Sequence, residues 1–230
     1  MRFRPTHTAL LVSLLISSVR AAHAEPLGSH QPLIEASLGA RVSKVGSPGY
    51  DPFADSDELV QVSLGVAATA LRADRFSLAG VGFWDYGGHS SQARGEATTL
   101  TTQRLTVGPE LRYHVISPLY VFVHALPAFA YTETSLDDAV AEATLSARHW
   151  SYGVDSAAGA AVELYGMRSG ESRLPRLWGI AEGGYGYLSS THLGLVPDAS
   201  SGAPQRTASI DLGSLSLSGP YARVSIAVSF

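Results

Sequence analysis

The sequence contains no cysteine among its 230 residues. This absence excludes disulfides, thiolate metal sites, thiol catalysis and lipidation of a mature N-terminal cysteine. Basic residues are also few, with 16 Lys and Arg against 20 Asp and Glu. Nucleic-acid-binding proteins concentrate Lys and Arg on one face, so this composition argues against nucleic acid as a partner.

Long apolar runs are the third absence. The run from Ala9 to Val19 is far shorter than the roughly 20 residues of a membrane-spanning helix. Two arginines precede it and Ala22-His23-Ala24 follows, so residues 1–24 are predicted to be a secretory signal peptide. Three arginines and no acid lie in that signal. The mature chain, residues 25–230, would then carry 16 − 3 = 13 basic and 20 acidic side chains, a formal charge of −7.

What the mature chain does contain is period-2 alternation of apolar and polar side chains, which is typical of strands with two different faces. Even positions of residues 34–42 are apolar, while Glu35 and Arg41 lie on the other face. Glycines blur the alternation in the third and seventh segments. The predicted strands are residues 34–42, 60–69, 76–84, 104–115, 119–131, 150–164, 177–188 and 215–230.

The connectors between these strands alternate in length. Short or medium links follow the second, fourth and sixth strands, and long polar segments follow the others, at residues 46–58, 85–99, 133–148 and 190–207. Bacterial outer-membrane barrels show this alternation. The sequence therefore predicts an all-β fold, a single antiparallel up-and-down transmembrane β-barrel of eight strands. Ten strands would follow if residues 133–148 or 190–207 held a further hairpin.

The last strand ends the chain with Val224, Ile226, Val228 and Phe230 on one face. This resembles the C-terminal signature of bacterial outer-membrane barrels, in which alternate apolar residues precede a final aromatic residue. In architecture and terminal signature, the mature chain is similar to the small OmpA/OmpX-type barrel superfamily, without a family-specific motif. The resemblance implies a cell outer-membrane location, contact with membrane lipid and lipopolysaccharide, and recognition of these four residues by the barrel-assembly machinery, with periplasmic chaperones assisting. We expect a monomer.

Charged side chains recur on the faces predicted to point inward. The interior of an eight-stranded barrel is just wide enough to be filled by side chains, and buried charges must be paired. We therefore expect a structural salt-bridge plug and a structural or surface-interaction role. If the same charges lined a conduit, the protein would be a narrow channel or transporter for small solutes. The predicted lumen charges are Arg41, Arg104, Glu110, Arg112, Asp155, Glu163, Glu182 and Arg223.

Histidines raise two hypotheses about chemistry. His114 and His124 lie on inner faces near Glu110, and would form a metal or acid/base pair or, as we favour, two hydrogen-bonded lumen residues. On the loop side, histidines have serine neighbours, as in rim-active lipid A or phospholipid acyl hydrolases and transferases. None of the catalytic motifs of those families is present, so we expect no enzyme, cofactor or metal site. The loop-side pairs are His89 with Ser90 and Ser91, His149 with Ser151, and His192 with Ser190.

Carboxylates gather in the first long connector. Asp51, Asp55, Asp57 and Glu58 have a density that suits Ca²⁺ or Mg²⁺, but the spacing lacks the EF-hand pattern. A solvated acidic loop is the favoured interpretation.

Overall fold

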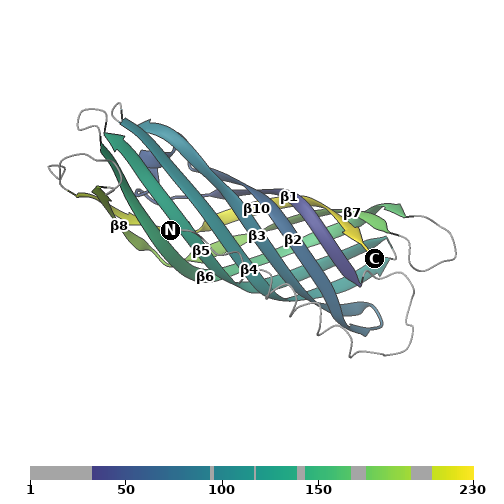
Figure 1. Ribbon diagram of the computed structural model, residues 1–230. Helices are drawn as coiled ribbons and strands as arrows, with labels where there is room; N and C mark the ends of the chain where they lie inside the picture. Colours follow the sequence, from purple (N-terminus) through teal and green to yellow (C-terminus); the bar gives the residue numbers. More distant parts are fainter. Residues whose placement is uncertain (1–32, 94–95, 117, 139–142, 167–174, 198–208) are drawn as a thin grey trace, which may run out of the picture.

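The computed structural model describes residues 33–93, 96–116, 118–138, 143–166, 175–197 and 209–230 (Figure 1). The predicted signal peptide lies outside the described residues. No helix in the described part of the chain is long and apolar enough to span a membrane.

Ten strands and one helical turn make up the described fold. They are β1 (Ile34–Lys44), η2 (Asp51–Phe53), β2 (Glu58–Ala73), β3 (Phe76–Ala93), β4 (Glu96–Ile116), β5 (Leu119–Asp138), β6 (Ala143–Gly166), β7 (Arg176–Leu188), β8 (Thr191–Pro197), β9 (Ile210–Leu215) and β10 (Gly219–Ser229).

Eight of these strands close into an antiparallel ring. Each strand from β1 to β7 pairs with the next, and β10 pairs with both β7 and β1. The strands β8 and β9 form a hairpin outside the ring, attached to the loop-side end of β6. The prediction of an eight-stranded up-and-down barrel is confirmed. The β8–β9 hairpin, whose first strand lies in the segment 190–207, brings the total to ten strands as the alternative allowed, but it does not enter the ring.

Two segments predicted to be long loops are instead continuations of strands. The β3–β4 ladder runs on from Asp85↔Arg104 to Ala93↔Glu96, and the β5–β6 ladder from Glu133↔Arg148 to Asp138↔Ala143. These segments are rich in polar residues, and for that reason they were predicted to be loops. Threonine is β-branched and favours strands. Its hydroxyl is tolerated in the protein interior where it has a hydrogen-bond partner. Thr98, Thr102, Thr132 and Thr134 all point inward and are buried.

In the half of the ring nearer the C-terminus, the outward face carries mainly apolar side chains, whereas the buried charged side chains of the ring point inward. On β1 and β10, Leu38 is 59% exposed and Val224 is 64% exposed, whereas Arg41 and Arg223 are buried. The face of β3, which its glycines had left ambiguous, is settled: odd-numbered residues such as Ser77 and Val81 point inward.

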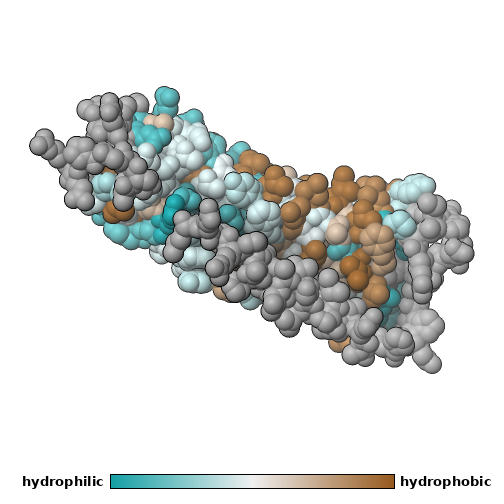
Figure 2. Space-filling model, in the orientation of Figure 1, coloured by the Kyte–Doolittle hydropathy of each residue, from teal (hydrophilic) through white to brown (hydrophobic). Residues whose placement is uncertain are grey.

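The outward surface changes character along the barrel. Figure 2 shows a hydrophobic surface over the half nearer the C-terminus and a mostly hydrophilic surface over the other half. Exposed aromatic residues border the apolar band, with Phe76, Tyr165 and Phe230 at one margin and Trp84, Tyr86, Trp150, Tyr152, Tyr185 and Tyr187 at the other. Beyond the second margin, β3 to β6 continue with exposed polar residues such as Ser90, Gln92, Thr99, Gln103 and Arg148.

The interior is filled in layers. An aromatic cluster that includes Tyr120, Phe122 and Trp178 lies toward the C-terminal end. Charged side chains occupy the middle. A second apolar cluster lies toward the loop end and is built partly from the segment between β1 and β2, whose Tyr50 and Phe53 are 1% and 0% exposed. Residues of this first connector therefore close the mouth of the barrel.

Candidate functional site

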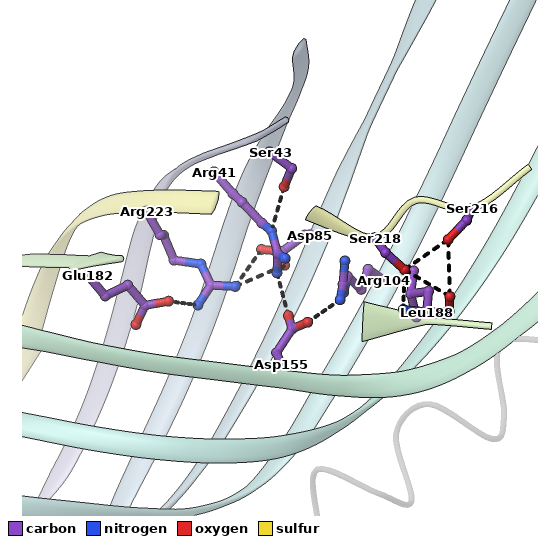
Figure 3. A network of polar contacts seen from close by, with 10 residues as sticks. All are labelled: Arg41, Ser43, Asp85, Arg104, Asp155, Glu182, Leu188, Ser216, Ser218 and Arg223. Atoms are coloured by element: carbon purple, nitrogen blue, oxygen red, sulfur yellow. Dashed lines mark hydrogen bonds and ion pairs between the residues drawn. The ribbon is translucent and has the colours of Figure 1, made fainter. Parts of the chain in front are cut away.

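The largest polar assembly in the barrel is a cluster of three arginines and three carboxylates (Figure 3). Nη1 of Arg41 lies 3.1 Å from Asp85 Oδ2 and 2.6 Å from Asp155 Oδ2. Arg104 donates to the other oxygen of Asp155. Arg223 forms ion pairs with both Asp85 (Nη2 to Oδ2, 2.9 Å) and Glu182 (Nη1 to Oε1, 2.6 Å). We call these six residues the upper cluster.

A second, smaller assembly lies nearer the C-terminal end and is called the lower cluster. Arg112 donates to Glu35 and, at 2.7 Å, to Glu110. The Tyr120 hydroxyl also donates to Glu35, at 3.2 Å, and His124 Nδ1 lies 3.1 Å from Glu110. These five residues come from β1, β4 and β5.

The two clusters differ in formal charge. The upper cluster sums to zero, with three arginines against three carboxylates. The lower cluster has one arginine and two carboxylates, a sum of −1 when His124 is neutral. A buried ionised group is costly unless it is paired and hydrogen-bonded, so each arginine depends on the carboxylates around it.

Aromatic rings complete the surroundings of the upper cluster. The guanidinium carbon of Arg41 lies 3.8 Å from the centroid of the Tyr221 ring, and that of Arg223 lies 4.1 Å from the Phe83 centroid. These cation–π contacts cover faces of the guanidinium groups that no hydrogen-bond acceptor reaches. The cluster is thus enclosed by protein on its faces as well as paired at its edges.

Seven of the eight predicted lumen charges lie in these two clusters. Glu163 is the exception, because it lies near the end of β6 with its side chain 18% exposed, 3.9 Å from Arg176. Asp85 was missed, since it was assigned to a loop. Extending the odd-residue parity of β3 from Ser77 would have placed Asp85 inside. Glu35, on the inner face predicted for residues 34–42, was not among the predicted lumen charges. The part of Tyr120 in the lower cluster was not predicted either.

The two inner histidines have separate partners. His114 Nε2 lies 3.0 Å from the Ser77 hydroxyl, whereas His124 contacts Glu110. Among the described residues, no group of three or more His, Asp or Glu side chains is arranged to hold a metal ion. The geometry therefore favours two hydrogen-bonded lumen histidines.

The loop-side histidines do not pair with their serine neighbours in the described part of the chain. His192 lies 3.4 Å from Asp211, and Ser91 donates to Asp55 at 2.6 Å. The acidic first connector is exposed at Asp51 and Asp57. Its Tyr50 is buried and donates to the Glu58 carbonyl, and burial raises the pKa of the Tyr50 hydroxyl to about 12. This connector is fastened to the barrel through Tyr50 and Asp55.

The space left between the two clusters is small. A cavity of about 20 Å³ is lined by residues such as Glu110, Arg112 and Glu182. A cavity needs roughly 10–15 Å³ to hold one water molecule. The described interior therefore has room at this level for about one water, not for a continuous column.

Removing the charge of Asp155 should destabilise the barrel strongly. Asp155→Asn keeps the shape of the side chain but leaves Arg41 and Arg104 without their shared anion. We expect the free energy of unfolding to fall by about 3–5 kcal/mol. The exposed pair of Arg148 and Glu133 supplies the control, because Glu133→Gln should cost at most about 1 kcal/mol. Urea titration of the folded proteins measures both, and equal losses would contradict a supporting role of the upper cluster.

Gly186 makes room for the same cluster. A Cβ at this position would lie 2.6 Å from Arg104 Nη2 and 2.8 Å from Asp155 Oδ1. Gly186→Ala should therefore displace these groups and cost about 1–3 kcal/mol. Gly80 on β3 has open space where its Cβ would lie, so Gly80→Ala should leave stability nearly unchanged in the same titration. A neutral Gly186→Ala would show that the cluster tolerates rearrangement.

Comparisons with known proteins find likeness in structure only. No protein-family model and no curated protein sequence matches the chain. Similar solved structures include Ail, the attachment invasion locus protein of Yersinia pestis, with 8% identity, TM-score 0.43, and coverage of 86% of this chain and 97% of Ail. Neisserial surface protein A has 10% identity, TM-score 0.41, and coverage of 90% and 100%. The transport unit of the Escherichia coli autotransporter AIDA-I has 10% identity, TM-score 0.43, and coverage of 100% and 99%. At these TM-scores, the strand register remains the basis of the fold described above.

Proposed function

We propose that this protein is an integral outer-membrane β-barrel with a sealed lumen, and that its role is structural and surface-directed. The observation that carries the proposal is the outward surface. An apolar band bordered by aromatic residues covers part of the barrel, and the strands β3 to β6 then continue beyond it with polar outward faces.

The apolar band supports insertion in lipid. Soluble monomers rarely expose contiguous apolar patches larger than a few hundred Å². Here the exposed apolar residues recur on all eight strands of the ring, for example Leu38, Val66, Leu111 and Ile226. Because the ring is closed, its backbone groups are paired between strands, as a lipid environment requires.

The proposed orientation of the barrel in the membrane follows from the lengths of the connectors at its two ends. Transmembrane barrels have short periplasmic turns and longer extracellular segments. The end that carries Phe230 has the short turn between β2 and β3, so we place it on the periplasmic side. The polar extensions of β3 to β6, the β8–β9 hairpin and the first connector then form an ordered extracellular half available for contacts with other molecules.

The interior argues for a plug and against a channel. The upper cluster fills the middle of the lumen, and apolar clusters that include Trp178 and Phe53 lie on its two sides. A solute path would have to pass all three layers. The described loop-side histidines do not support the enzyme hypothesis, because they do not pair with their serine neighbours.

Refolding and conductance measurements test the proposal together. The mature protein should require detergent, migrate in a heat-modifiable way on denaturing gels, and show no reproducible conductance in planar bilayers. Arg104→Ala should remain non-conducting like the exposed control Glu133→Gln, because the apolar clusters that include Trp178 and Phe53 still close the lumen on both sides of the upper cluster. A monomer that is folded and soluble without detergent would contradict the membrane location, and steady wild-type conductance would contradict the sealed lumen.

The terminal strand generates a prediction about assembly. If Val224, Ile226, Val228 and Phe230 form the signal recognised by the assembly machinery, Phe230→Ser should reduce insertion far more than the burial energy of order 2 kcal/mol explains. Phe129 is a matched control, since it also points outward, at 40% exposure against 64% for Phe230. Heat-modifiable protein recovered from outer membranes measures insertion, and wild-type levels for both variants would make Phe230 an ordinary strand residue.

A further inference from the structure

The loop-side part of β6 lacks a strand partner over a short interval. The β7 ladder ends at Gly153↔Leu188, where the Ser189 N–H donates to the Tyr152 carbonyl at 2.8 Å. Strand β8 joins β6 only farther along, at Leu145↔Pro197 and Ser146↔Val196. Between these points, residues 147–151 pair with β5 on one side and with no described strand on the other.

A pocket occupies this interval. Its volume is about 360 Å³, within the range of small-molecule sites. A register shift between His192 and Gly194 also interrupts the pairing of β8 with β9 beside it. The pocket is lined by Ser146, Ala147, Arg148, His149, Gly194 and Val196.

One polar atom in the pocket wall has no partner. Nε2 of His149 is buried and makes no hydrogen bond with the described residues. Leaving a buried donor or acceptor unsatisfied is costly, so such atoms are uncommon in proteins. A rotation of the His149 ring that brings this nitrogen to a ligand in the pocket would remove the cost.

The chemistry of the pocket favours a neutral ligand rich in hydroxyl groups. The ionisable neighbours already have partners, Arg148 with Glu133 at 2.8 Å and His192 with Asp211 at 3.4 Å. The remaining groups are backbone amides along the open edge of β6, a serine hydroxyl and an imidazole, which together can donate and accept. Val196, 54% exposed, adds an apolar flank. Sugar hydroxyls both donate and accept, and sugar rings also present C–H faces.

We propose that this pocket binds a sugar unit of a saccharide. It lies immediately beyond the second aromatic margin, where the ring centroids of Tyr131 and Trp150 are 5.1 Å apart. The inference rests on the proposed function, because in an outer membrane this level is occupied by lipid-linked sugars. The same chemistry would also recognise a free glycan.

Gly194 allows the pocket to be filled without disturbing the backbone. A Cβ at this position meets no atom within 4 Å. Gly194→Leu should therefore fold normally and occupy the pocket. Gly46 is a matched control, since it also has open space but does not line the pocket. His149→Phe keeps a ring and removes the unpartnered nitrogen.

The experiment titrates detergent-refolded protein with two probes, the core oligosaccharide released from lipopolysaccharide by mild acid and intact lipopolysaccharide. Saturation-transfer difference NMR and calorimetry report binding. We expect Gly194→Leu to lose about tenfold in affinity or more, a loss near 1.4 kcal/mol. His149→Phe should lose about fivefold, as for one hydrogen bond, and Gly46→Leu should match the wild type.

Each outcome decides between alternatives. Binding of the released oligosaccharide, lost in Gly194→Leu, supports a site for saccharides in general, whereas binding of intact lipopolysaccharide alone, lost in the same variant, identifies the lipid-linked source. Wild-type affinity in Gly194→Leu, or no binding of either probe by heat-modifiable protein, overturns the inference. The two proposals fail separately: a detergent-dependent barrel that binds no sugar refutes only the pocket, and a water-soluble protein that binds sugar refutes only the membrane location.

Discussion

The antiparallel pairing of β1 with β10 is the constraint on which the rest of the structure depends. Its register runs from Glu35↔Ser229 to Ser43↔Tyr221 and joins the first described strand to the last. This pairing removes the free edges that an open sheet would present. It also converts a two-faced sheet into an inside and an outside, so that the alternation along every strand acquires a fixed meaning.

Closure with eight strands leaves a narrow interior, and that narrowness makes the charges act together. Asp85 accepts hydrogen bonds from Arg41 and Arg223, and Asp155 accepts them from Arg41 and Arg104. Each of these carboxylates therefore bridges two arginines from different strands. The absence of a side chain at Gly186 provides the space in which they meet. The upper cluster is better described as one connected assembly than as a set of independent pairs.

The outside is divided along the barrel axis, although the same strands run through both parts. One part has an apolar surface bordered by aromatic rings, and the other has a polar surface. The polar part has a defined shape, because the first connector is held to it by the bonds of Ser91 with Asp55 and of Thr98 with the Pro52 carbonyl. A surface-directed role is consistent with this order, since a shaped surface can be selective where a loose loop cannot.

The sequence by itself determined the antiparallel barrel and the face on which residues such as Arg41, Arg104 and Arg223 lie, and it favoured eight strands over ten. Alternation is a local property that consecutive residues reveal, so these features needed no knowledge of partners. The tertiary structure alone decided where β3 to β6 end, that Asp85 lies inside, that Glu163 stays apart, and that Phe53 closes the mouth. It also decided the pocket beside His149. These features depend on which strands meet around a closed ring, and the ring joins residues such as Asp85, Asp155 and Arg223 that are far apart in the chain, Asp85 and Arg223 by 138 positions. No local pattern carries that register.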